Sequence, residues 1–320
     1  MHRQRILFAI LGIHITGALS DSELDGAWQK WMGLNGKTYP NRVSEFTHRQ
    51  TWERNYWRVL EHNSRHNSTF RMELNFLADQ TFERASIASA KLTEDTLRFQ
   101  PESDIAVSFN DILLPDSWDW RTKGAVTPVN EQGQFGDSQA YAAGECVESF
   151  SFIKTRDLVV GSSAEMHDCC TATGFATKTV FDCVHNIGGL CTDRDYPSSY
   201  EQCYNDSCTP VAKVSGGQKL QTGDEEAMKS AVYLTPVLAF VDGSLTSFQL
   251  YKEGIYSDPY CSSSTVNHAL QVVGYGSLNG MDYWICRNSW GLYWGMNGYI
   301  TIARNRRNMC GIASFSSYPV

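Results

Sequence analysis

The stretch DYWICRNSWGLYWGMNGYITIAR, residues 282–304, contains two short runs of β-branched and aromatic residues separated by glycines and an asparagine. Runs of this kind, bounded by turn-forming residues, are typical of β-strands. Two further runs of the same character precede it, VLAFVD at 237–242 and ALQVVGYG at 269–276. The last third of the chain is therefore predicted to form a sheet.

The first part of the chain is instead polar and prone to form helices. Positions that recur every three or four residues share one helical stripe, namely Glu45, Arg49, Trp52, Asn55, Val59 and Asn63. An ordinary apolar stripe would not carry an acid, an arginine and two amides. We expect these groups to form a buried polar network that fixes the helix to another segment.

A second helix is expected from Ser138 to Ile153, where an Asp-Ser pair provides the cap and an alanine-rich run follows. Its buried face would contain Ala140, Tyr141, Ala143 and Val147. Helices that come before the strands, rather than alternating with them, indicate an α+β fold.

The N-terminus has the features of a secretory signal peptide. A short basic segment, MHRQR, precedes the apolar run ILFAILGIHITGALS, which ends in small residues. This run is too short to span a membrane, so residues 1–20 are predicted to be a signal peptide that is cleaved near Ser20. No later stretch is apolar over the length of a transmembrane helix, about 18 residues or more, so no membrane span is expected in the mature chain.

The composition argues against nucleic-acid binding, because the net charge is −8 and no basic run or stripe is present. All ten cysteines lie after residue 140. In a secreted chain such cysteines indicate disulfides rather than a zinc site, so neither a metal nor a cofactor is expected. Sequons at Asn67 and Asn205 fit the same route and are predicted glycosylation sites.

Several motifs together carry a family resemblance. They are the segments DWRTKGAVTPVNEQG, NHALQVVGYG and YWICRNSWGLYWGMNGYITIARNRRNMCGIASFSSYPV. In this order they resemble the papain-like cysteine peptidases, and among these the cathepsin L group. The stripe at 45–63, together with Asn75, Leu77 and Asp79, resembles the inhibitory prosegment of that group.

The resemblance implies a two-lobed fold with a helical left lobe and an antiparallel β-barrel right lobe, preceded by a helical prosegment. The prosegment is expected at 21–113 and the peptidase C1 domain at 114–320, because the composition changes near Leu114. The domain would therefore have the chain's own prosegment as its first partner.

The same resemblance assigns roles to residues of the site. Ser138, His268 and Asn288 follow one another in the order and at the separations of the family's Cys, His and Asn. His268 would be the general base, and Asn288 would fix its tautomer. Gln132 would supply a side-chain donor to the oxyanion, and Trp290 would shield the bond between the His and the Asn.

The loop before the second helix departs from the family pattern Gln-Gly-x-Cys-Gly-x-Cys-Trp. Ser138 replaces the catalytic cysteine, Phe135 replaces the cysteine three residues earlier, and Gln139 replaces the tryptophan. A serine hydroxyl does not ionise appreciably where a cysteine forms a stable thiolate, and Asn288 has no charge to stabilise an imidazolium. Replacing the carboxylate of a serine triad by Asn reduces turnover by about 10⁴. Weak or absent peptidase activity is therefore predicted.

Two further departures affect the substrate cleft. The family's Gly-Cys-x-Gly-Gly loop is missing after Asp168 and Cys169, which removes a disulfide partner and the glycines that let a substrate backbone pair closely. Phe240 falls where the group has a small residue lining the main specificity pocket. The phenyl ring is expected to fill part of this pocket.

The cysteines differ in how far they can be assigned. The resemblance implies two disulfides, Cys169–Cys203 and Cys261–Cys310. Cys191 and Cys208 are unusual for the group and could pair with each other, whereas Cys170 and Cys183 could pair or stay free.

Cys146 and Cys286 are expected to be buried thiols that act as small hydrophobic residues. Cys286 lies two residues before Asn288 and, by strand alternation, on the same face. A substitute nucleophile at Cys286 is therefore the alternative to a purely structural role.

Three functions are compatible with these residues. The favoured one is a non-catalytic monomer that binds a protein or peptide ligand in the former cleft, as expected for testin-type members that carry serine at the nucleophile position. The alternative is an active endopeptidase that uses Ser138, His268 and Asn288. A role like that of the silicateins is least favoured, because silicateins keep the neighbouring disulfide. The expected location is the secretory pathway, with a secreted or lysosomal destination.

Overall fold

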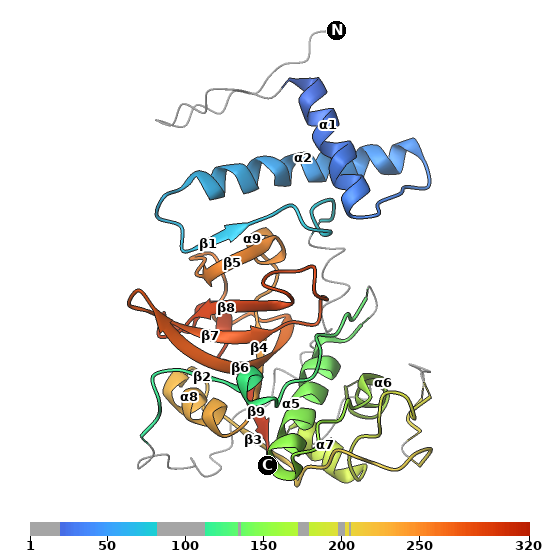
Figure 1. The fold of residues 1–320 in the computed structure, drawn as a ribbon, viewed down its shortest axis with the longest axis vertical. Coiled ribbons are helices and arrows are strands. Elements are labelled where there is room, and N and C mark those ends of the chain that lie inside the picture. The colour runs from blue at the N-terminus through green and yellow to red at the C-terminus, as the bar shows by residue number, and fades with distance from the viewer. Residues whose placement is uncertain (1–19, 82–112, 134–135, 172–178, 198–201, 205) are drawn as a thin grey trace. The chain divides into compact units, whose positions relative to one another are not determined.

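The computed structural model, shown in Figure 1, describes residues 20–81, 113–133, 136–171, 179–197, 202–204 and 206–320. The predicted signal peptide lies outside the described residues apart from Ser20, and so do Phe135 and the sequon residue Asn205. The chain forms two compact units, residues 1–49 and 50–320.

Helix α1 (Asp21–Leu34) is the first element of the N-terminal unit. Its start is fixed by a capping box, in which the Ser20 side chain accepts from the Glu23 amide and the Glu23 carboxylate accepts from the Ser20 amide at 2.7 Å. Trp28 and Trp31 are buried and stack with their ring centroids 5.2 Å apart. Capping and aromatic packing together hold this short helix.

Helix α2 (Arg42–Ser64) begins in the first unit, ends in the second, and contains all the positions of the predicted stripe. Within the second unit its two amides bond to the backbone that follows. The Asn55 side chain donates to the Ala78 carbonyl at 2.8 Å. Asn63 donates to the Met72 carbonyl at 2.8 Å and accepts from the Met72 amide at 3.0 Å. The predicted helix is confirmed, and the two amides bond to the following segment as expected, but of the predicted polar groups only Asn55 is buried, whereas Glu45, Arg49 and Asn63 are partly exposed.

These bonds hold strand β1 (Phe70–Met72), which no sequence pattern predicted. β1 pairs antiparallel with β5 (Tyr251–Tyr256), far along the chain. Beside this pair, the buried Asn75 side chain donates to the Gln249 carbonyl at 2.8 Å. The segment that follows α2 is therefore joined to the C-terminal part of the chain by backbone pairing and by a buried amide.

The second unit contains further strands, which are β2 (Trp118–Asp119), β3 (Gly217–Lys219), β4 (Val237–Val241), β6 (His268–Leu278), β7 (Met281–Arg287), β8 (Tyr299–Ala303) and β9 (Ser316–Pro319). The described strands form an unclosed sheet in the order β1-β5-β8-β7-β6-β4-β9-β3, with β2 paired to β6. Only β5 and β8 run parallel, and the other described pairs are antiparallel. The strands predicted in the last third correspond to β4, β6, β7 and β8.

The helical elements of this unit are η2 (Trp120–Lys123), α5 (Ser138–Thr155), α6 (Ser163–Glu165), η3 (Met166–Thr171), α7 (Val180–Asn186), α8 (Glu225–Leu234), α9 (Thr246–Gln249) and η4 (Met309–Gly311). In Figure 1, α5, α6 and α7 gather beside one end of the sheet. Most strands lie apart from this group of helices, whereas α8 and α9 lie beside the sheet, and the α+β, two-lobed fold is confirmed. No helix of the described part is long and apolar enough to cross a membrane.

Helix α5 is capped by Asp137, as its sequence predicts. The Asp137 carboxylate accepts from two amides of the first turn at 2.9 and 3.4 Å. Ala140, Ala143 and Val147 are completely buried, whereas Tyr141 is only half-buried. The helix packs its small residues against the sheet.

Asn63→Ala should lower the free energy of unfolding by about 1–3 kcal/mol, because the partly buried backbone amide and carbonyl of Met72 would lose their partner. Urea unfolding followed by circular dichroism measures this change. Asn67→Ala is the matched control, since Asn67, the described sequon residue, lies exposed in the turn after α2. Its change should stay within about 0.5 kcal/mol. Equal losses in the two variants would contradict the role given to Asn63.

Candidate active site

Ser138 is the first residue of α5 and is completely buried. Two residues before it, a Cβ atom on Gly136 would lie 2.1 Å from the Gln132 carbonyl oxygen. Only glycine fits at this position. The Ser138 hydroxyl oxygen accepts a hydrogen bond from the Ala269 amide at 3.1 Å. This bond ties the start of the helix to strand β6.

His268 and Asn288 come from neighbouring strands. His268 is the first residue of β6, and Asn288 directly follows β7. The His268 Nε2 and Asn288 Oδ1 atoms are 2.7 Å apart, and the Ser289 amide donates to the same oxygen at 2.8 Å. Because this oxygen only accepts, a neutral imidazole carries its proton on Nε2 and its lone pair on Nδ1. The arrangement selects the tautomer whose Nδ1 atom can take a proton.

The surroundings of His268 keep its imidazole neutral. The side chain is completely buried, and burial lowers its pKa to about 4 against the opposing effect of the bond to Asn288. The ring centroid of Trp290 lies 4.7 Å away, and that of Phe248 lies 6.0 Å away. Nδ1 has no hydrogen-bond partner among the described residues. The predicted base and its predicted orienting amide therefore lie together, but in the described structure no hydrogen bond joins the imidazole to Ser138.

Gln132 is held on the Asn288 side of the site. Its backbone amide donates to the Ser289 carbonyl at 2.8 Å, and its side-chain oxygen accepts from the Ser289 hydroxyl. Its side-chain nitrogen donates to the Gly136 carbonyl at 3.1 Å. The amide thus links the strand end to the loop before α5, and its role as an oxyanion donor stays a prediction.

Phe240 lies on β4, directly beside the strand that carries His268. In the ladder Phe240 faces Ala269, and Val241 faces His268. The Phe240 side chain is 7% exposed and belongs to a buried apolar cluster that includes residues of α5 and β6. Its predicted position in a specificity pocket stays a prediction, but the ring itself is packed into the core.

Two protein-family models match the chain. Residues 114–320 match the papain family of cysteine proteases, and residues 28–84 match the cathepsin propeptide inhibitor domain (I29). The chain belongs to the papain family of cysteine peptidases. Its inhibitor-type propeptide domain is part of the same chain.

Individual relatives extend this result over nearly the whole length. The chain is 36% identical to cathepsin K of Mus musculus over 325 residues, which cover 95% of this chain and 96% of that protein. It is 38% identical to cathepsin S of Bos taurus, with 93% of each protein covered. The structure of the recombinant stem bromelain precursor matches with a TM-score of 0.81 at 30% identity, covering 93% of this chain and 99% of that one. The proform of the ragweed pollen allergen Amb a 11 matches with a TM-score of 0.84 at 30% identity, covering 94% and 95%.

The described residues of this papain-family chain contain the disulfides Cys169–Cys203, Cys261–Cys310, Cys170–Cys183 and Cys191–Cys208. The first two are the pairs that the family resemblance implies, and the last two resolve pairings that the sequence left open. Cys146 and Cys286 are free thiols and are completely buried. Burial raises the pKa of both. Cys286 is therefore unsuited to act as a substitute nucleophile.

A buried ionic cluster between α5 and β7 was not predicted from the sequence. Arg287 and Glu145 form an ion pair at 3.1 Å, with side-chain exposures of 0% and 2%. Arg287 also donates to the Thr127 hydroxyl at 3.0 Å, which in turn donates to Glu148 at 2.5 Å. Glu148 further accepts from the Gly161 amide at 2.9 Å. The signal was present in the sequence as two acids three residues apart in an apolar helix and an arginine in an apolar strand.

The helix cap has partners that the sequence reasoning also missed. The second carboxylate oxygen of Asp137 lies 3.2 Å from Nδ1 of His167 and accepts from the Thr171 hydroxyl. Both partners belong to η3. The hydrogen bond to Asp137 raises the pKa of His167, so the charged imidazolium is favoured here. The start of α5 is thereby tied to η3 as well as to β6.

His268 should stay neutral, with its proton on Nε2, down to about pH 5, because its pKa is about 4. Nitrogen-15 NMR of histidine-labelled protein distinguishes the tautomers and the imidazolium, and the His268→Gln variant identifies the signal. A His268 signal that titrates near the usual histidine pKa of about 6.5 would show that the ring is more hydrated than the structure indicates.

The buried acids give the stability a pH dependence of known sign. Burial raises the pKa of Glu148 to about 7, against the opposing charge of Arg287. The folded chain therefore binds this proton more tightly than the unfolded chain, so the Glu148 contribution to stability is lost as the pH rises from about 4.5 to about 7. His268 acts in the opposite direction, since its lowered pKa costs stability as the pH falls below about 6.5.

Comparison with a Glu148→Gln variant isolates the Glu148 contribution. Between about pH 5 and about pH 8, the unfolding free energy of the unchanged chain minus that of the variant should fall by about 1–3 kcal/mol. Urea unfolding at a series of pH values measures it. Glu253→Gln, which changes an exposed acid on β5, should show no such trend. A flat difference for Glu148→Gln would mean that this carboxyl is ionised in the folded chain throughout.

Proposed function

We propose that this papain-family chain is a catalytically impaired or inactive peptidase homologue that acts by binding. One observation carries the proposal. The buried Ser138 hydroxyl accepts from the Ala269 amide at 3.1 Å, while Nδ1 of His268 has no hydrogen-bond partner among the described residues. Without a ligand, no hydrogen bond joins the nucleophile position to the predicted base, and this supports the proposal.

The chemistry of serine makes this separation harder to overcome. A cysteine in such a place can exist as a thiolate before the substrate arrives, whereas Ser138 needs His268 to take its proton during the attack. That transfer would create an imidazolium where burial already lowers the His268 pKa to about 4. Asn288 offers no negative charge to stabilise that imidazolium, as the buried carboxylate of a serine triad does.

The ligand we propose is a protein or peptide in the former substrate cleft of a monomeric chain. The propeptide is the partner that the chain itself supplies. It pairs β1 with β5 and bonds Asn75 to Gln249. The four disulfides of the described part fit an oxidising secretory route. We further propose a secreted or lysosomal destination, with glycans at Asn67 and Asn205.

A slow endopeptidase is the second candidate, and the retained pair of His268 and Asn288 favours it. Their 2.7 Å bond fixes the tautomer that a general base needs. In this mechanism Ser138 would rotate toward Nδ1 when a substrate binds, and Gln132 would donate to the oxyanion. Hydrogen bonds of a catalytic site often tighten only in the substrate complex.

Peptide cleavage assays separate the two candidates. Chain freed of its propeptide should cleave peptidyl fluorogenic substrates no faster than its Ser138→Ala variant, from about pH 4 to about pH 8. The reason is that Ser138 and His268 are not coupled for proton transfer. Cleavage that disappears in Ser138→Ala would overturn the proposed function and establish the slow endopeptidase.

Ser138→Cys locates the cause of the inactivity. E64, the inhibitor in complex with the bromelain protease of Ananas comosus in one of the similar solved structures, serves as the probe for a reactive thiol. Cleavage together with E64 labelling in this variant would assign the loss to the nucleophile alone. If this variant neither cleaves the substrates nor reacts with E64, although circular dichroism shows that it is folded, the loss of activity is due to the cleft as well.

A further inference from the structure

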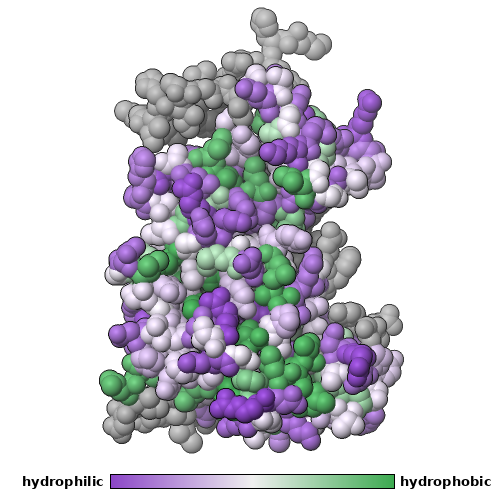
Figure 2. Space-filling model, in the orientation of Figure 1, coloured by the Kyte–Doolittle hydropathy of each residue, from purple (hydrophilic) through white to green (hydrophobic). Residues whose placement is uncertain are grey.

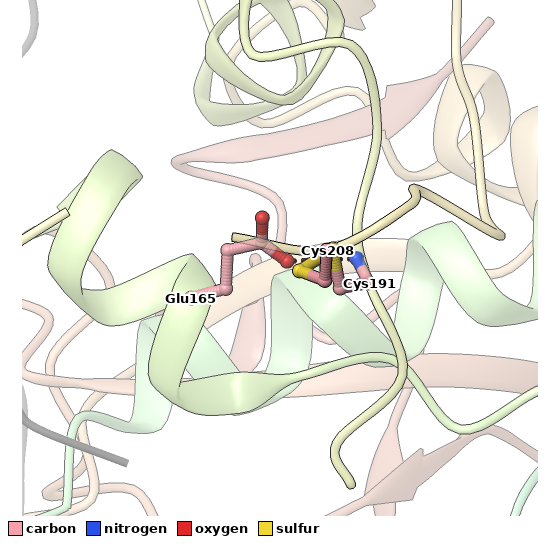
Figure 3. A group of neighbouring side chains, drawn as sticks. All are labelled: Glu165, Cys191 and Cys208. Carbon is pink, nitrogen blue, oxygen red and sulfur yellow. Dashed lines mark hydrogen bonds between the residues drawn. A yellow bond between two sulfur atoms is a disulfide. The ribbon is translucent and has the colours of Figure 1, made fainter. Parts of the chain in front are cut away.

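The disulfide between Cys191 and Cys208 lies outside the site described above. It is not one of the two bonds that the family resemblance implies, and it joins cysteines 17 residues apart. Figure 3 shows the two sulfurs beside the carboxyl group of Glu165, the last residue of α6. The chain thus places a titratable acid against a disulfide of its own.

Glu165 is completely buried and is fixed by the backbone of Cys191. One carboxyl oxygen, Oε2, accepts from the Cys191 amide at 2.7 Å. The other oxygen, Oε1, is buried and has no hydrogen-bond partner in the described part of the chain. A carboxyl oxygen of Glu165 and the two sulfurs lie within 4.8 Å of one another. One oxygen of the Glu165 carboxyl group therefore lies near both sulfurs, and the other oxygen has no hydrogen-bond partner in the described part of the chain.

An acid and two sulfurs so close together also have the composition of a metal site. Metals bind cysteine as the thiolate, however, and both sulfurs are engaged in the disulfide. The chemistry open to this group in the described state is therefore that of the disulfide itself.

The two sulfurs differ in their access to solvent. Cys191 is completely buried. Cys208 is half-buried, and its chain neighbours Ser207 and Thr209 are exposed. Thiol–disulfide exchange proceeds by attack of a thiolate on one sulfur and departure of the other. A thiolate from solution can thus approach Cys208, and the leaving sulfur is then that of Cys191.

We propose that Cys191–Cys208 is an exchange-competent disulfide that reacts with low-molecular-weight thiols, and that Glu165 is the acid that protonates the leaving Cys191 sulfur. In the first step the thiolate RS⁻ bonds to the Cys208 sulfur, the Cys191–Cys208 bond breaks, and its electron pair goes to Cys191. The proton of Glu165 passes to Cys191, and Glu165 regains a proton from solvent. A second thiolate then attacks the mixed disulfide, which releases RSSR and leaves Cys208 to be protonated by water.

The burial of Cys191 explains why an internal acid is needed. A thiolate released in an apolar, buried place is disfavoured by desolvation, and the cluster around it consists of Ala164, Tyr196 and the two cysteines. The same burial raises the pKa of Glu165, against the effect of the Cys191 amide. The carboxyl group therefore holds its proton to higher pH than an exposed acid and can deliver it where the charge would develop.

The test is reduction of the full chain by glutathione, with trapped thiols located by mass spectrometry. We expect Cys191–Cys208 to open before Cys170–Cys183, whose cysteines are both buried, and we expect the glutathione adduct on Cys208. The opening rate per unit of glutathione thiolate should fall as the pH rises through the Glu165 titration. A Glu165→Gln variant, whose amide oxygen can still accept from the Cys191 amide, should open at least about tenfold more slowly and without this pH trend.

The opening rate of Cys170–Cys183 in the same samples is the internal control, and it should be equal in the two chains. Opening of Cys170–Cys183 first, or an adduct on Cys191, would overturn the proposal. An unchanged rate in a folded Glu165→Gln variant would overturn it too. If that variant does not fold, the pH profile and the adduct site of the unchanged chain still decide, because a flat profile excludes Glu165 as the acid.

Discussion

The folded peptidase domain depends on how one buried charge, the guanidinium of Arg287, is satisfied. A buried charge without a partner costs several kcal/mol, and Glu145 supplies the partner at 3.1 Å. Arg287 directly precedes Asn288, whereas Glu145 lies about two turns after Ser138 in α5. The ion pair therefore sets the spacing between the helix that begins with Ser138 and the strand that leads to Asn288. The alignment of the site follows from a contact that takes no part in its chemistry.

This separation of scaffold and chemistry explains how the site can keep its shape without turnover. His268 and Asn288 share a hydrogen bond in a completely buried place, and the imidazole packs against the rings of Trp290 and Phe248. Removal of either residue would leave a buried polar group without a partner. Both residues thus contribute to the folded structure, whether or not the chain cleaves peptides.

Figure 2 shows hydrophilic and hydrophobic residues interspersed on the visible face, as expected for a folded domain in water.

The sequence predicted those features that depend on local spacing or on a family pattern. The stripe along α2, the strands of the last third and the Asp137 cap are local, and two disulfides followed from the resemblance. The contacts between Ser138 and Ala269 and between Asp137 and His167 join segments whose approach only the folded chain defines. The short strand β1 was missed for the same reason. Its three residues become a strand only because β5 lies beside them.

The pairing of β1 with β5 has a consequence for the processed form of the chain. β1 is the terminal strand of the sheet, so β5 is an inner strand only while the propeptide is present. Departure of the propeptide would leave the Ile255 amide, which donates to the Thr69 carbonyl at 2.8 Å, without its partner. An uncovered strand edge is a template to which another extended chain can add. While the propeptide is in place, β1 covers the backbone edge of β5 that would otherwise be open to such pairing.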